Sequence, residues 1–82
     1  IMKKILYFTA AWCGPCKALS PIMDSLQGQI NFDKIDVDSN TDLSAQYGVR
    51  GVPSLVLLEN GEEVSRLVGV QSKESILNFY NG

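Results

Sequence analysis

The sequence predicts an α/β fold built on a mixed four-stranded sheet that carries helices on both faces. The continuous apolar run at residues 5–8 indicates a strand buried on both sides. Apolar residues then recur at helical spacing directly after it. Asn60-Gly61 separates two later strand-like runs as a tight turn. The elements before that hairpin alternate as strand–helix–strand–helix, which predicts a right-handed crossover and a parallel pair, followed by antiparallel strands.

The first half of the chain supplies two strands and the helix between them. After residues 5–8, the helix is expected over about residues 13–27, closed by Gly28. Pro21 lies inside it and should kink it, because proline lacks an N–H and crowds the preceding turn. Residues 30–37 read as the second strand. The apolar face of the helix consists of Leu19, Ile22, Met23 and Leu26.

The second half supplies a short helix, the hairpin and a last helix. Cap-type residues at 39–42 precede a helix that contains Leu43 and Tyr47 and ends at Gly48. Residues 54–59 and 62–68 are the hairpin strands. The last helix is capped by Ser72, and its apolar residues are Ile76, Leu77, Phe79 and Tyr80. The expected order is β-α-β-α-β-β-α.

Composition limits both the organisation and the chemistry of the chain. Its 82 residues predict a single domain, residues 1–82. A formal net charge of −2 with interspersed charges gives nucleic-acid binding no electrostatic support. The apolar runs are too short for a membrane span or for a signal peptide, so we expect a cytoplasmic protein without membrane contact. We also expect it to be a monomer. The absence of histidine excludes imidazole catalysis and imidazole metal ligands.

The only two cysteines, Cys13 and Cys16, are separated by two residues. A bridge between them closes too small a loop to stabilise the fold much, so the pair indicates redox chemistry or metal binding. Cys13 is expected at the junction between the first strand and the helix. At a helix start, the unpaired backbone N–H groups and the helix dipole stabilise a thiolate. Lys17 adds positive charge that salt largely screens. We therefore interpret Cys13 as the nucleophile and Cys16 as the more buried, resolving thiol.

Zinc binding is the alternative for this pair. A Cys-x-x-Cys pair is also half of a four-thiolate zinc site. No second pair and no histidine completes four ligands here, so such a site would need two chains. The position of the pair between a strand and a helix favours redox chemistry, with no metal and no cofactor beyond the cysteines themselves.

The segment Trp12-Cys13-Gly14-Pro15-Cys16-Lys17 resembles the complete active-site motif of the thioredoxin family. The similarity runs from Lys3 onward and implies a minimal thioredoxin-like fold and a thiol–disulfide oxidoreductase. Further matching positions are Pro21, Lys34, residues 47–53, Asn60-Gly61 and Val68-Gly69.

The resemblance also implies how a substrate binds. Pro53 would be a cis-proline that faces the cysteines, and the Val52 backbone would pair with an extended substrate segment. The expected substrate-binding rim consists of Trp12, Gly14, Pro15, Val52, Pro53 and Gly69. Disulfide-containing proteins are the implied substrates, and an enzyme of the thioredoxin-reductase type would recycle the oxidised pair.

Two departures from the family pattern matter. The family's N-terminal strand and helix are not present before residue 3, and Tyr7 stands where the family usually places a buried aspartate beneath the second cysteine. Lys34 aligns with the usual partner of that aspartate. We interpret Tyr7 as a core aromatic residue, although its hydroxyl could instead contact Lys34 or a water near Cys16. In either case deprotonation of Cys16 should be slower, without loss of activity.

Two other functions remain open. A glutathione-linked, glutaredoxin-like reductase is supported by the short chain and opposed by the Trp-Cys-Gly-Pro-Cys motif. A thioredoxin-fold binding subunit would need the docking rim but not the thiols, so it would survive replacement of the cysteines. Gly14-Pro15 between the cysteines resembles the reducing members of the family, which favours reduction of protein disulfides.

Overall fold

The computed structural model describes residues 1–82 and confirms the expected order of elements. The chain runs through β1 (Lys3–Thr9), α1 (Gly14–Ser25), β2 (Phe32–Asp36), α2 (Thr41–Gln46), β3 (Ser54–Glu59), β4 (Glu62–Val68) and α3 (Lys73–Asn81). The four strands form one sheet in the order β2-β1-β3-β4. β1 is parallel to β2 and antiparallel to β3, and β3 is antiparallel to β4, so the predicted mixed sheet is confirmed.

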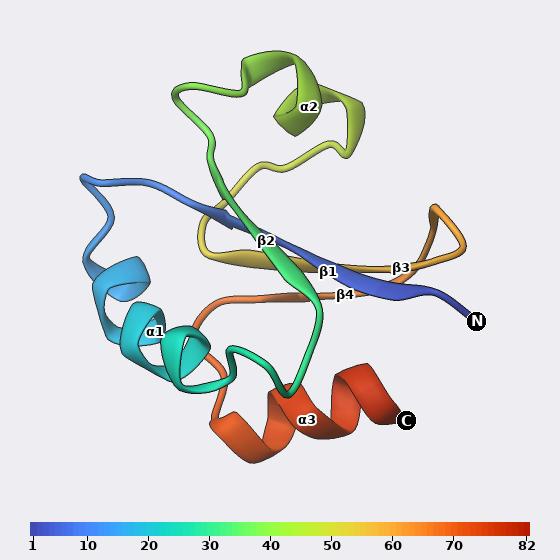
Figure 1. Ribbon diagram of the computed structural model, residues 1–82. Coiled ribbons are helices and arrows are strands. Elements are labelled where there is room, and N and C mark those ends of the chain that lie inside the picture. Colours follow the sequence, from blue (N-terminus) through green and yellow to red (C-terminus); the bar gives the residue numbers. More distant parts are fainter.

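The sheet separates the helices into two layers. Figure 1 shows α1 and α3 on one side of the strands and α2 on the other. Side chains alternate accordingly along β1: Ile5 and Tyr7 pack with α1 and α3, whereas Leu6 and Phe8 face the α2 side. All four are buried, and burying a large apolar side chain stabilises a fold by about 1.5–3 kcal/mol. The strand that leads into the cysteines is therefore held from both faces.

The hairpin turn forms where the sequence predicts it. Asn60 and Gly61 have positive φ values of 52° and 85°. A two-residue turn of this hand matches the twist of the strands, and asparagine followed by glycine tolerates it best. Asn60 also joins the hairpin to the chain start, since its N–H donates to the Met2 carbonyl over 2.8 Å.

The end of α1 differs from the expectation. The helix passes through Pro21 but ends at Ser25, and Gly28 does not cap it. Leu26 turns fully into the core, and its carbonyl accepts hydrogen bonds from the N–H groups of Gln29 and Ile30. Gly28 lies in the resulting turn with a φ of 83°. Because the turn after α1 occupies these residues, β2 begins at Phe32 rather than at residue 30.

Candidate active site

Cys13 and Cys16 lie where β1 ends and α1 begins, as predicted. Cys13 is the N-cap of α1, with an extended backbone (φ −89°, ψ 115°), and its Sγ accepts a hydrogen bond of 3.1 Å from the Cys16 N–H. Pro15 occupies the first turn, where no N–H partner is needed. The sulfur thus takes the place that a serine or aspartate oxygen fills at other helix starts. An N–H donor and the helix dipole both favour negative charge on this atom.

The two cysteines form a disulfide and are both almost fully buried. Cys13 is 4% exposed and Cys16 is 2% exposed, so the expected contrast in burial is small. They pack with Ala10 in a small apolar cluster that also contacts Val37 and Val52. The difference between the two sulfurs therefore lies less in exposure than in what each one faces.

Cys13 faces the loop that carries Val52 and Pro53. Its Sγ lies 3.5 Å from the Val52 carbonyl oxygen. The Val52–Pro53 peptide bond is cis, in agreement with the resemblance, and the Pro53 carbonyl accepts a 2.9 Å hydrogen bond from the Gly69 N–H. Gly69 has a φ of 91°, which a side chain would strain. The structure thus brings Val52, Pro53 and Gly69 together beside Cys13.

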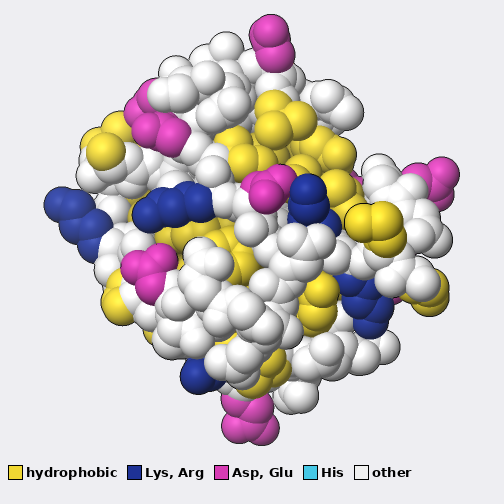
Figure 2. All heavy atoms as spheres, in the orientation of Figure 1, with side chains coloured by type: hydrophobic (Ala, Val, Ile, Leu, Met, Phe, Trp, Pro, Cys, Tyr) yellow, Lys and Arg dark blue, Asp and Glu magenta, His cyan; other side chains and the backbone are white.

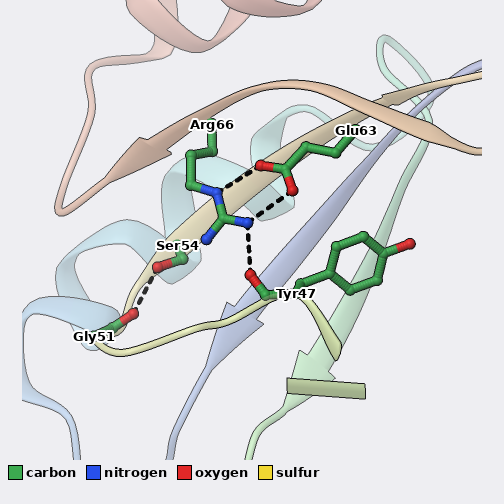
Figure 3. Close-up of polar contacts among 5 residues, drawn as sticks. All are labelled: Tyr47, Gly51, Ser54, Glu63 and Arg66. Atoms are coloured by element: carbon green, nitrogen blue, oxygen red, sulfur yellow. Dashed lines mark hydrogen bonds and ion pairs between the residues drawn. The ribbon is translucent and has the colours of Figure 1, made fainter. Parts of the chain in front are cut away.

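The segment before Pro53 is tied to the edge strand β4 (Figure 3). The Arg66 guanidinium donates to the Tyr47 carbonyl over 2.6 Å and holds the Glu63 carboxylate through two further hydrogen bonds of 2.6 and 2.8 Å. At the other end of the segment, the Ser54 hydroxyl donates to the Gly51 carbonyl over 2.6 Å. These bonds fix the segment on both sides of Val52. Sequence reasoning missed Arg66 because its partner lies nineteen residues away, on a backbone atom.

Trp12 projects from the turn before α1. The side chain is 69% exposed, as expected for a rim residue, and its indole Nε1 donates to Asp38 over 2.9 Å. Trp12 and Val52 line one shallow hollow of about 130 Å³, together with Val37, Val49, Arg50 and Gly51. Gly14 and Pro15 are exposed at the adjacent start of α1. The predicted rim residues thus surround Cys13, and their role in binding remains a prediction.

Tyr7 belongs to the hydrophobic core. It is 1% exposed, packs edge-on against Phe32, and its hydroxyl has no hydrogen-bond partner. Lys34, its neighbour across the parallel pair, directs its ammonium to the Ser20 hydroxyl at 3.5 Å instead. The alternative in which the Tyr7 hydroxyl contacts Lys34 is therefore not what the structure shows.

A second hollow, of about 440 Å³, opens beside Cys16. It lies between the start of α1 and the ends of β1 and β2. Sequence reasoning missed two polar residues of this hollow, Asp36 and Ser20. Their spacing was a usable signal, because Asp36 is two strand positions after Lys34 and Ser20 is one helical turn after Cys16. The lining residues are Thr9, Ala10, Ala11, Cys16, Lys17, Ser20, Lys34 and Asp36.

The surface carries mixed charge. Acidic and basic side chains are interspersed over the face shown in Figure 2. No group of three or more cysteine, aspartate or glutamate side chains is placed to hold a metal ion. None of the three helices combines the length and the apolar character needed to cross a bilayer.

Comparison with known proteins agrees with this geometry. The family model described as Thioredoxin matches residues 2–81. The thioredoxin of Rickettsia conorii is 41% identical over 78 residues, which are 90% of this chain and 74% of that protein. The thioredoxin of Haemophilus influenzae is 42% identical over 81 residues, which are 94% of this chain and 76% of that protein.

Solved structures give the same result. A mutant thioredoxin from Halobacterium salinarum superposes with a TM-score of 0.90 at 42% identity, covering 96% of this chain and 72% of that one. Fasciola hepatica thioredoxin gives 0.86 at 30% identity, covering 95% and 80%. With its cysteine pair joined at the start of α1, the chain belongs to the thioredoxin family and is a thiol–disulfide oxidoreductase.

Proposed function

We propose that this protein reduces disulfides of other proteins in two steps, with Cys13 as the nucleophile and Cys16 as the resolving thiol. The observation that carries the assignment is the hydrogen bond from the Cys16 N–H to Cys13 Sγ at the start of α1. Only Cys13 has its sulfur at the helix cap, where a thiolate is stabilised. The thiolate is the form of cysteine that attacks disulfides.

In the first step, the Cys13 thiolate attacks one sulfur of the substrate disulfide. A bond forms between Cys13 and that sulfur, the substrate S–S bond breaks, and the other substrate sulfur leaves as a thiolate that takes a proton from water. The Val52 backbone would hold an extended substrate segment beside Cys13 by strand-like pairing. The exposed Trp12 ring and the hollow next to it supply apolar contact area.

In the second step, Cys16 loses its proton and attacks Cys13 Sγ. The mixed disulfide breaks, the second substrate thiolate leaves, and Cys13 and Cys16 are joined as in this structure. Two electrons have then passed from the cysteine pair to the substrate. A reductase must return them, and we propose one of the thioredoxin-reductase type. A reducing pair also needs a compartment that keeps thiols reduced, so we place the protein in the cytoplasm.

The test compares the natural sequence with Cys16→Ser on a protein that contains an accessible disulfide. With a thioredoxin reductase and its electron donor, the natural sequence should turn over, and Cys16→Ser should stop as a mixed disulfide through Cys13. Peptide mapping of the trapped species identifies the attacking sulfur. Trapping through Cys16 in Cys13→Ser at an equal rate would contradict the assignment.

The recycling partner is tested in the same assay. Replacing the reductase with glutathione and glutathione reductase should give little turnover. Turnover with glutathione alone would assign a glutaredoxin-like function instead. Inactivity under both conditions, with retained binding of a partner by the double cysteine variant, would assign a binding subunit.

A further inference from the structure

The resolving step requires Cys16 to lose a proton from a buried position. Cys16 is 2% exposed and lies in an apolar cluster, and burial disfavours the charged form of a thiol. Tyr7 stands at the sheet position where the thioredoxin family usually has an aspartate, and its buried hydroxyl has no hydrogen-bond partner. Another group must therefore receive the proton if the step is to be fast near neutral pH.

The hollow of about 440 Å³ is the only one of the three surface hollows that Cys16 lines. It opens at the surface and is large enough for several water molecules, so water in it can reach the wall that Cys16 helps to form. Thr9 and Asp36 are paired across β1 and β2 at its sheet side, and Lys17 and Ser20 border it on α1.

The charged groups that face Cys16 across this hollow are Lys17, Lys34 and Asp36. A lysine ammonium group is a hydrogen-bond donor only and has no lone pair with which to accept a proton. Asp36 has no salt-bridge partner; one carboxylate oxygen accepts the Asp38 N–H over 2.9 Å, and the other makes no hydrogen bond. The turn after β2 thus holds the carboxylate in place and leaves one oxygen available.

We propose that Asp36 accepts the Cys16 proton, through water in this hollow, during the second step of the proposed exchange. The S–H bond of Cys16 breaks, a bridging water passes a proton to the Asp36 carboxylate, and the Cys16 thiolate attacks Cys13 Sγ. The exposed Asp36 then releases the proton to solvent. Lys34 and Lys17 stabilise the transient negative charge on the sulfur side of the hollow. This proposal rests on the two-step exchange, in which Cys16 is the resolving thiol.

The experiment separates the two steps with dithiobis(nitrobenzoate), an aromatic disulfide that releases a coloured thiolate at each step. In stopped flow, the reduced protein should release one thiolate as Cys13 attacks and a second as Cys16 resolves, the second at a rate independent of protein concentration. Asp36→Asn keeps the acceptor for the Asp38 N–H but cannot take a proton. We expect it to slow the second phase about tenfold at pH 7. This is less than the roughly hundredfold or larger rate increase that a directly hydrogen-bonded general base contributes, because Asp36 is exposed and acts through water. The first phase should stay within about twofold.

Two matched variants and a pH series complete the test. Asp33→Asn removes the same charge from the same strand but on the opposite face, and it should change neither phase. Asp36→Glu should recover most of the second-phase rate. The difference in second-phase rate between Asp36→Asn and the natural sequence should shrink as pH rises, because hydroxide then deprotonates Cys16 directly. An unchanged second phase, or a difference equal at every pH, would overturn the role of Asp36. Loss of the first phase in the natural sequence would instead overturn the exchange mechanism itself.

Discussion

Tyr7 places an aromatic ring where the resemblance calls for a carboxylate, and its surroundings explain how the chain accommodates it. The ring belongs to the larger core cluster together with Leu19, Met23 and Leu55. Its hydroxyl is buried without a hydrogen-bond partner, and an unsatisfied buried polar group costs about 1–3 kcal/mol. The ring therefore stabilises the core, and the hydroxyl does not.

Tyr7→Phe should consequently preserve the stability of the fold or raise it by about 1 kcal/mol, because it removes the unpaired hydroxyl and keeps the ring. Urea unfolding of the reduced protein measures this. Tyr7→Leu serves as the control, since it removes the ring as well and should destabilise the fold. A loss above about 1 kcal/mol in Tyr7→Phe would show that the hydroxyl is hydrogen-bonded in solution.

The limits of sequence reasoning are clearest at single residues. The positions of Cys13 and Cys16 could be predicted because a local transition from strand to helix places them. Trp12 could be placed on the surface for the same reason. Arg66 could not be assigned, because its partner is a backbone carbonyl on a distant segment. The spacing of Asp36 from Lys34 places the two on one face of β2, but only the folded chain shows the hollow that this face borders. The prediction that Gly28 closes the helix was wrong, because α1 ends at Ser25, two residues before the predicted end, and the next residue, Leu26, is fully buried in the core.

Among the elements, β4 has a function beyond completing the sheet. It is an edge strand with mostly exposed side chains, yet its Arg66 holds the segment that leads to Val52 (Figure 3). Glu63 orients the guanidinium from three residues away. The edge strand β4 thereby holds the segment between Tyr47 and Val52, which precedes β3 in the chain.

Arg66→Lys should weaken substrate docking and leave the thiol chemistry intact. Lysine loses the planar fork that binds Glu63 and the Tyr47 carbonyl together. KM for a protein disulfide should rise about threefold to tenfold, which corresponds to the loss of one typical hydrogen bond of about 0.5–1.5 kcal/mol. The reaction of Cys13 with dithiobis(nitrobenzoate) should not change. Glu62→Gln, on the same strand, is the control. An unaltered KM in Arg66→Lys would show that the loop holds its position without this anchor.

The same ion pair predicts a pH dependence of stability. The hydrogen bond from Arg66, aided by its charge and opposed by partial burial, holds the pKa of Glu63 below the ordinary value of 4.5. A carboxyl with a lowered pKa in the folded state stabilises the fold above its unfolded pKa, and this contribution is lost as pH falls through the folded pKa. Because the pair is about one-third exposed, it contributes at most about 1 kcal/mol.

Glu63→Gln should therefore lose less stability than the natural sequence when the pH falls from about 5 to about 3. Urea unfolding at several pH values measures the difference, with Glu62→Gln as the control for removal of an unpaired charge. Parallel pH curves for the natural sequence and Glu63→Gln would contradict the contribution of the pair.

At the scale of the whole molecule, stability should be concentrated in the two central strands. β1 and β3 pair on both sides, and five of the six residues of β3 are buried. α2 has only six residues, and no side chain caps its first turn. Regions with few buried contacts open at lower free energy than the global unfolding.

Hydrogen exchange should follow this gradient. The amides of β1 and β3 should exchange most slowly, those of β4 faster, and those of α2 fastest. Exchange followed by mass spectrometry or NMR on the oxidised protein tests the order. Protection of α2 equal to that of β3 would contradict it and would mean that the two faces of the sheet unfold only together.

The two sulfurs open toward different sides of the molecule: Cys13 toward Val52, and Cys16 toward the hollow between α1 and β2. In the proposed exchange, substrate and protons would therefore use separate routes. A bulky partner bound against Val52 in the proposed way would leave the hollow beside Cys16 open. The rate of the internal step is then set by the protein itself and hardly by the size of its partner. Such independence would suit the proposed reduction of protein disulfides, in which one cysteine pair reacts with partners of different size.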